Sequence, residues 1–212
     1  MSWPTPEQIR TALAAHPATD VPALPGRRND LRAGVLVPLV WEPDPVVLLT
    51  LRGSHLRRHA GEVSFPGGSP DPLDADLQAT ALREAHEELG IENAEVLGRL
   101  SSMPLYTSEF RLVPFVAAVE GGELKPDPQE VAAVLRVPIR GLLEPPQQPA
   151  IPWSDGEQVH LSPVFMVEDY AVYGGTAHTL WELLQVLAPL FGRAMPMLIA
   201  TGLDWHDVMV WG

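Results

Sequence analysis

Hydrophobic residues recur along the chain with helical spacing near both ends. Residues 5–15 carry a narrow apolar stripe behind Thr5, a residue type that commonly caps helices, and predict a short helix. A second helix is predicted over residues 176–188, where Pro189 ends the pattern and one face carries Leu180, Leu183, Leu184, Val186 and Leu187. Both segments therefore have a face to bury against other elements.

Runs of Val and Leu predict the strands of a sheet. Residues 33–41 and 46–51 are two such runs, and the turn sequence Glu-Pro-Asp-Pro separates them. Further strands are predicted at residues 62–65, 95–101, 112–119 and 131–137. Proline-rich stretches at residues 17–32 and 145–152 predict connecting loops. Strands that alternate with a few helices indicate a mixed α/β or α+β sandwich.

The length of the chain suits one domain. Its 212 residues with 46% hydrophobic content are enough to bury a sizeable core. We expect a single domain over residues 1–212, made of an N-terminal helix and linker (1–32), a core (33–177) and a C-terminal helix and tail (178–212).

The most informative segment is the helix predicted over residues 74–90. Asp74 is the candidate N-cap and Gly90 is the natural stop. At about 100° per residue, one apolar band contains Leu77, Ala81, Leu82, Ala85 and Leu89. By the same geometry Glu88 falls within that band, so at least one carboxylate points along the edge of the buried face.

Three glutamates of this helix, Glu84, Glu87 and Glu88, lie within about 100° of one another. Carboxylates this close repel one another, and a divalent cation such as Mg²⁺, which prefers oxygen ligands, would reverse that cost. Arg83 precedes the three and is placed to orient one of them. From the helix alone, a solvated acidic face remains the alternative to a metal site.

Composition narrows the classes of partner. With 14 Lys+Arg against 27 Asp+Glu, the net charge of −13 argues against binding nucleic acid by neutralising its phosphates. The absence of cysteine excludes disulfides and thiolate metal sites. The chain begins without a secretory signal pattern and carries no apolar run long enough to span a membrane. We therefore expect a soluble cytoplasmic protein with neither nucleic-acid nor membrane partners.

Residues 68–91 resemble the Nudix box, whose pattern is G-x5-E-x7-R-E-U-x-E-E-x-G-U with U apolar. Residues 83–91 match its second half in full. The first half differs, because Asp74 stands in the place of the early Glu and eight residues rather than seven separate it from Arg83. That difference leaves the metal-binding half of the motif intact.

The preceding segment, residues 48–68, resembles the fingerprint L-L-T-x-R-[SA]-x3-R-x3-G-x3-F-P-G-G of the coenzyme A pyrophosphatase branch of the Nudix hydrolases. Only Gly53 departs from it, at a position where Ser or Ala is usual. Residues 113–116 and 175–177 resemble the branch more loosely. The chain is therefore identified as similar to this branch.

This resemblance implies a Nudix α/β/α sandwich, with a mixed β-sheet and a catalytic strand-loop-helix. Glu84 and Glu88 would be the principal ligands of Mg²⁺ or Mn²⁺, Glu87 would act through a second ion or bound water, and the carbonyl oxygen of Gly67 would be a further ligand. The implied activity is cleavage of the diphosphate of coenzyme A or its derivatives to 4′-phosphopantetheine and adenosine 3′,5′-bisphosphate.

Two arginines are candidates for holding the phosphates of the substrate, beside the close backbone approach that Gly67 and Gly68 allow. Arg52 and Arg57 have the planar guanidinium fork that suits phosphate oxygens, and a surface salt bridge is the alternative role for each. Glu62 is a candidate for orienting the metal ligands. Two more candidates have an ordinary surface role as their alternative: His59 for proton transfer and Glu130 as an extra acid from a distant loop.

Two other functions stay open at the level of sequence. The same helix would serve an enzyme that cleaves another nucleoside diphosphate derivative, such as ADP-ribose or a dinucleotide. A domain that senses nucleotides without turning them over is a further alternative, against which the intact acidic trio argues. A homodimer is compatible with the apolar C-terminal third.

Overall fold

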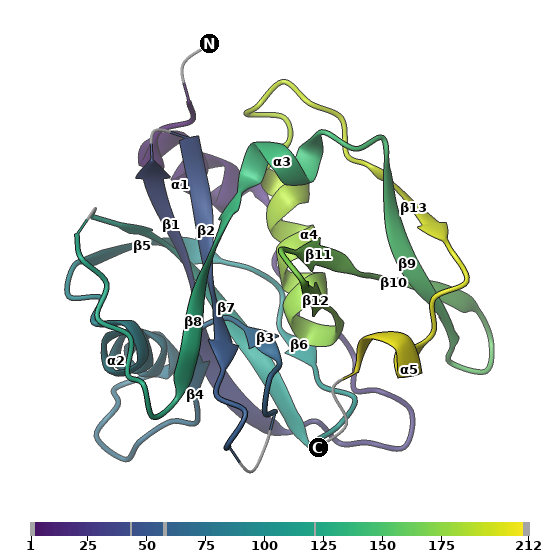
Figure 1. Ribbon diagram of the computed structural model, residues 1–212, viewed down its shortest axis with the longest axis horizontal. Coiled ribbons are helices and arrows are strands. Elements are labelled where there is room, and N and C mark those ends of the chain that lie inside the picture. Colours follow the sequence, from purple (N-terminus) through teal and green to yellow (C-terminus); the bar gives the residue numbers. More distant parts are fainter. Residues whose placement is uncertain (1–2, 43, 57–58, 121, 210–212) are drawn as a thin grey trace.

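A mixed sheet forms the centre of the computed structural model, which describes residues 3–42, 44–56, 59–120 and 122–209 (Figure 1). Within those ranges eight strands belong to it: β1 (Leu31–Glu42), β2 (Asp44–Arg52), β3 (Val63–Ser64), β4 (Gly67–Gly68), β5 (Ala94–Arg99), β6 (Met103–Pro104), β7 (Phe110–Val119) and β8 (Val131–Pro138). The strand order is β3-β2-β1-β7-β5, while β4 pairs with β1, β6 with β7 and β8 with β2.

The central strand β1 combines both kinds of pairing. It is antiparallel to β2, which confirms the predicted pair of strands, and parallel to β7. The strands predicted at residues 62–65, 95–101, 112–119 and 131–137 are confirmed as β3, β5, β7 and β8, with ends shifted by a few residues. Because β1 and β7 start at the same edge of the sheet, residues 31–34 lie beside residues 110–113.

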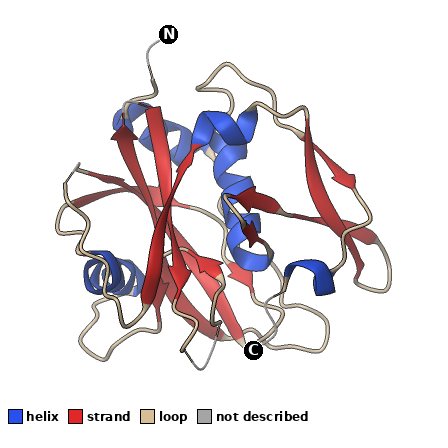
Figure 2. Cartoon of the chain, in the orientation of Figure 1, coloured by secondary structure: helices blue, strands red, loops and turns tan. Residues whose placement is uncertain are grey.

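Helices cover both faces of this sheet (Figure 2). On one face lies α2 (Leu77–Leu89), and on the other lie α1 (Pro6–Ala15) and α4 (Gly174–Leu187), with the short α3 (Ile139–Leu143) at the end of β8. The predicted three-layer α/β/α sandwich is thus confirmed. In the ranges that the structure describes, no helix combines the length and apolar character needed to span a membrane.

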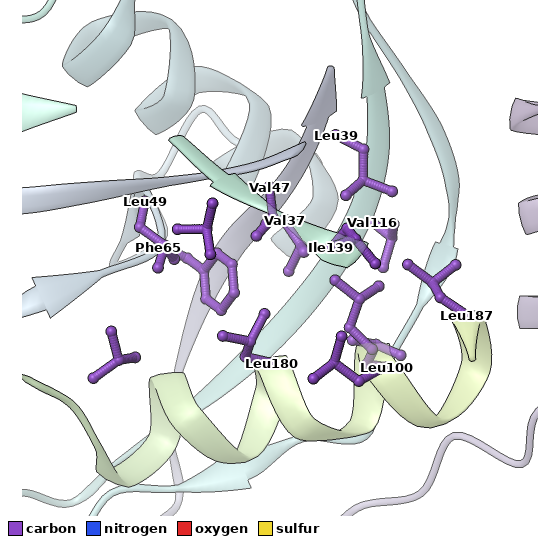
Figure 3. Close-up of a cluster of buried hydrophobic side chains, with 14 of the residues drawn as sticks. Val37, Leu39, Val47, Leu49, Phe65, Leu100, Val116, Ile139, Leu180 and Leu187 are labelled. Atoms are coloured by element: carbon purple, nitrogen blue, oxygen red, sulfur yellow. The ribbon is translucent and has the colours of Figure 1, made fainter. Parts of the chain in front are cut away.

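Alternate residues of β1 contribute to two separate apolar clusters. Leu36 packs in one cluster with Ala85 of α2. The next residue, Val37, belongs to the other cluster, which includes Leu180 of α4 (Figure 3). Successive side chains of a strand point to opposite faces, so one short segment supports both layers of helices.

The backbone of α2 lies directly against β1 at Gly34. A Cβ atom at this position would lie 2.2 Å from the carbonyl oxygen of Leu77 and 3.2 Å from the amide nitrogen of Ala81. Gly34 is also the strand partner of Gly68 in β4. A glycine at this one position therefore brings the helix and β4 close together.

The start of α2 differs from the prediction. Asp76, not Asp74, is the N-cap, and its side chain accepts a hydrogen bond of 2.8 Å from the amide of Ala79. The predicted N-cap is wrong because Asp74 is engaged by Arg83 further along the helix. The predicted stop is confirmed, since Gly90 ends α2 with φ 69°, a left-handed conformation that glycine adopts at little cost.

A smaller sheet follows the main one along the chain. It contains β9 (Gln147–Ser154), β10 (Val159–Pro163) and β13 (Met197–Ala200) in the order β10-β9-β13, beside the hairpin of β11 (Phe165–Val167) and β12 (Tyr170–Val172) and the helix α5 (Trp205–Val208). The prediction of a loop at residues 145–152 is wrong, because most of this segment is β9, the middle strand of the smaller sheet. Each proline there lacks one N–H donor but keeps its acceptor: the carbonyl oxygen of Pro149 accepts from Val164 at 2.9 Å.

The close contact at Gly34 predicts a loss of stability on adding one methyl group. In Gly34→Ala the helix or the strand must move apart, and we expect the free energy of unfolding to fall by about 1–3 kcal/mol. Urea denaturation measures this change. The matched control is Gly141→Ala, where a Cβ atom would meet nothing within 4 Å. Equal denaturation midpoints for Gly34→Ala and wild type would contradict the packing argument.

His178 of α4 predicts an acid-sensitive contact between that helix and β10. The imidazole is partly buried and shares a hydrogen bond of 3.0 Å with the Ser162 hydroxyl, and burial lowers the pKa of His178 from 6.5 to about 4. Between those pH values the unfolded chain binds the proton that the folded chain excludes, so stability present above pH 6.5 is lost as the pH falls.

Equilibrium unfolding across this pH range tests the contribution of His178. We expect wild type to lose more stability on acidification than His178→Gln does. His86→Gln, which removes an exposed histidine, should follow wild type. Parallel pH profiles for wild type and His178→Gln would show that His178 is not the responsible group.

Candidate active site

Two glutamates of α2 lie against the glycine pair of β4. A Cβ atom at Gly68 would be 2.5 Å from the Oε1 atom of Glu84, whose side chain is 18% exposed. One helical turn further on, Glu88 is 3% exposed, and its Oε1 atom accepts a long hydrogen bond of 3.5 Å from the amide of Gly67. The predicted meeting of Glu84 and Glu88 with Gly67 and Gly68 is thus observed.

Burial destabilises the charged forms of Glu88, which is buried, and of Glu84, which is partly buried. Burial raises the pKa of Glu88 to about 7, and the Gly67 amide and the charge of Arg52 only partly oppose this. Burial also raises the pKa of Glu84, against the opposing effect of Arg83. Among the described residues, the Oε2 atom of Glu88 has no hydrogen-bond partner. An unpaired buried oxygen of this kind costs free energy that a cation would offset.

These groups fit a hard divalent cation. Two carboxylates and a backbone carbonyl offer the oxygen donors that Mg²⁺ and Mn²⁺ prefer, and Mg²⁺ fills its remaining positions with water and substrate phosphates. Glu84, Glu88 and the Gly67 carbonyl oxygen would hold such an ion. Each of these ligand assignments stays a prediction.

Glu87 is separated from this pair. Its side chain is 57% exposed and accepts a hydrogen bond of 2.8 Å from the Nη1 atom of Arg83. In the described part of the chain, no three acidic or histidine side chains form a group that could hold a metal ion by themselves. The expectation that all three glutamates converge on one pocket is therefore not met, and a role for Glu87 through water or a second ion stays a prediction.

Asp74 and Arg83 form a clamp beside the two buried glutamates. The Nε and Nη2 atoms of Arg83 each donate to the Asp74 carboxylate at 3.1 Å, and Nη2 lies 3.0 Å from Oε1 of Glu84. Hydrogen bonds, first of all from Arg83, lower the pKa of Asp74 to about 2, so this carboxylate stays charged. Arg83 is thus placed to orient the Glu84 carboxylate, as predicted. The sequence did not predict that Asp74 holds Arg83 in this position.

Of the two arginines predicted to bind substrate phosphates, only Arg52 lies within the described residues. Arg52 lies at the end of β2, and its charge lowers the pKa of Glu88, which places it close to the acidic pair. Its Nε atom is buried and has no hydrogen-bond partner among the described residues. Arg57 lies outside the residues that the structure describes. The other two candidates from this loop, His59 and Glu62, pair with each other at 2.8 Å.

The loop before β8 also reaches this site. The backbone carbonyl of Glu130 accepts a hydrogen bond of 2.8 Å from the amide of Gly53. The negative charge of the Glu130 side chain contributes to the raised pKa of both Glu84 and Glu88. The distant-loop acid considered from the sequence is therefore near the acidic pair. A Cβ atom at Gly53 would lie 2.6 Å from the ring of His55, so this exposed ring would have to move to admit a side chain there.

Comparison with known families and sequences agrees with this geometry. The family model described as the NUDIX domain matches residues 30–155. An uncharacterized Nudix hydrolase NudL from Photorhabdus laumondii is 38% identical over 161 residues, which cover 74% of this chain and 85% of that protein. A protein of the same name from Yersinia enterocolitica is 43% identical over 114 residues, which cover 52% and 58% of the two chains.

Similar chains also occur among solved structures. An ADP-ribose pyrophosphatase from Streptococcus suis has 16% identity and a TM-score of 0.47, with coverage of 79% of this chain and 97% of that one. The NUDIX domain of Shewanella oneidensis NrtR, complexed with ADP ribose, has 21% identity and a TM-score of 0.44, with coverage of 54% and 76%. The NUDIX match alone spans more than half of the sequence. With its glutamate pair on the helix that follows the glycine strand, the chain belongs to the Nudix hydrolase family.

Proposed function

We propose that this protein is a divalent-metal-dependent pyrophosphohydrolase that cleaves the diphosphate of coenzyme A or its derivatives. The products are 4′-phosphopantetheine and adenosine 3′,5′-bisphosphate. The observation that carries the catalytic part is the position of the partly buried Glu84 and the buried Glu88 against β4, with one carboxylate oxygen of Glu88 left unpaired within the described structure. The substrate is supported by the fingerprint over residues 48–68.

The residues of the site divide the work of hydrolysis. Glu84 and Glu88, with the Gly67 carbonyl oxygen, would hold Mg²⁺ or Mn²⁺, and the bound ion would supply Lewis-acid stabilisation of charge on the phosphoryl oxygens. Arg83 fixes the direction of the Glu84 carboxylate through their contact of 3.0 Å. Arg52, whose charge acts on Glu88, binds a diphosphate oxygen through its guanidinium fork.

A proton must leave the attacking water. Glu130 is exposed and lies on a separate loop, and it is not one of the residues assigned to the metal. Its carboxylate is therefore the group that accepts this proton. Glu87 would act on the metal through bound water or a second ion. The substrate is a small nucleotide derivative, and the protein acts in the cytoplasm.

Loss of one buried carboxylate should abolish turnover without unfolding the helix. In Glu84→Gln and Glu88→Gln we expect kcat for coenzyme A with Mg²⁺ to fall by at least about 100-fold, because the lost charge acts on the transition state. Release of adenosine 3′,5′-bisphosphate measures the rate. Glu92→Gln, an exposed residue just after α2, is the control and should match wild type. Metal-dependent activity of Glu84→Gln equal to wild type would refute the assignment of the site.

The substrate is tested by a panel of diphosphates. Wild-type protein with Mg²⁺ or Mn²⁺ should show kcat/KM for coenzyme A or an acyl derivative at least about tenfold above that for ADP-ribose and diadenosine diphosphate. Mass spectrometry of the products in ¹⁸O-labelled water also identifies the phosphorus that is attacked. A preference for ADP-ribose would retain the catalytic site and reject coenzyme A as the substrate.

A further inference from the structure

Three arginines gather in an open pocket where β1 and β7 begin. The pocket has a volume of about 370 Å³, and its charged lining residues are Arg28, Arg32, Arg111, Asp20 and Asp30. None of the glutamates of the candidate active site lines it. In a chain with 14 Lys+Arg and a net charge of −13, this is a local concentration of positive charge. We call it the arginine pocket.

Arg111 is the buried member of this group. It is 8% exposed, and its guanidinium donates to the carbonyl oxygens of Asn29 at 2.8 Å and Val21 at 3.0 Å and to the hydroxyl of Ser102 at 2.9 Å. All three acceptors are neutral. Within the described residues Arg111 forms no salt bridge, and its Nη2 atom donates no hydrogen bond. A charge this deeply buried normally has an ionic partner.

The second arginine adds to this unbalanced charge. Arg32 and Arg111 are register partners on the parallel strands β1 and β7. Like charges on neighbouring strand positions destabilise a sheet unless another group compensates them. Asp20 meets Arg32 at 3.0 Å, but it reaches Arg111 only through the Ser102 hydroxyl, which donates to Asp20 at 2.8 Å. The pair of strands therefore presents more positive charge than its neighbours neutralise.

The ion pairs at the mouth of the pocket are easily exchanged. The side chains of Arg32 and Asp20 are 49% and 44% exposed, and those of Arg28 and Asp30, which meet at 2.6 Å, are 84% and 49% exposed. Exposed pairs of this kind contribute only about 0–1 kcal/mol. Both arginines can thus turn towards a stronger anionic acceptor at little cost.

The wall of the pocket is already held in place. Asn29, 1% exposed and with φ 45°, donates from Nδ2 to the carbonyl oxygens of Leu105, Ser108 and Phe110 at 3.0–3.1 Å. Its Oδ1 atom accepts from the amide of Leu24 at 3.0 Å. A loop fixed in this way needs little ordering when a ligand binds, which favours affinity.

We propose that the arginine pocket binds a phosphate group. The guanidinium fork matches phosphate oxygens, and a phosphate dianion would compensate Arg111 while replacing the weak contacts of Arg28 and Arg32. The phosphate belongs to the nucleotide substrate or is free inorganic phosphate. Arg32 lies two residues before Gly34, the partner of Gly68, so the pocket begins about 7 Å along β1 from the active-site level.

Calorimetric titration of inorganic phosphate into the metal-free full-length protein tests the site. At low ionic strength we expect saturable binding to one site, weakened at least about tenfold in Arg32→Gln, because a charge-assisted contact is lost. Asp30→Asn should bind phosphate more tightly, since it frees Arg28 and removes a repelling carboxylate. Arg136→Gln is the matched control: its side chain is 42% exposed and pairs with Glu42 on β1 outside the pocket.

The outcomes separate a phosphate site from ordinary surface charge. Absence of saturable binding to wild type, or equal affinities for wild type and Arg32→Gln, would overturn the proposal. Arg111→Lys keeps a positive charge but loses the fork, and it should weaken binding as well. If Arg111→Lys fails to fold, the exposed Arg32 and Asp30 variants, with their opposite expected signs, still decide the question.

A second arm identifies the source of the phosphate and rests on the proposed function. If the substrate supplies it, Arg32→Gln raises KM for coenzyme A and leaves KM for dephospho-coenzyme A unchanged. If free phosphate is the ligand, both KM values stay at wild type while phosphate binding is weakened. The calorimetric arm needs no turnover, so phosphate binding by a protein that hydrolyses neither compound would refute the proposed function and retain the pocket.

Discussion

The contact of α2 with β1 at Gly34 is the constraint on which the candidate active site depends. A helix backbone can approach a strand this closely only where no side chain intervenes, since a Cβ atom at Gly34 would lie 2.2 Å from a carbonyl oxygen of α2. The same glycine pairs with β4. The side chains of Glu84 and Glu88 are thereby packed against a glycine backbone, where Glu84 is partly and Glu88 almost fully shielded from water. Their raised pKa values are a consequence of this packing.

The sequence predicts the layers of the fold well because their apolar spacing is local information. The periodicity of α2 places Glu88 within the apolar band, and the structure buries this residue. The position of Glu87 could not be read in the same way. The position of the Glu87 side chain is set by Arg83, whose Nη1 atom contacts Glu87 and whose Nη2 atom contacts Glu84. Partner choice of this kind depends on side-chain contacts that periodicity does not contain.

Contacts between distant segments account for the other differences from the sequence predictions. Asp74 and Asp76 are equally good capping residues by type. Asp74 pairs with Arg83, and Asp76 caps the helix instead. The strand β9 was missed because its prolines are typical of loops and because one of its two partners, β13, lies far along the chain. The arginine pocket likewise exists only because parallel pairing aligns Arg32 with Arg111.

The clamp between Asp74 and Arg83 forms although the first half of the box differs from the usual pattern. Aspartate is one methylene shorter than the glutamate usual at this place, and the chain has one more residue between the acid and the arginine. The Asp74 carboxylate still accepts hydrogen bonds of 3.1 Å from the Nε and Nη2 atoms of Arg83. A shorter acid at a longer sequence separation can therefore contact the arginine that directly precedes Glu84.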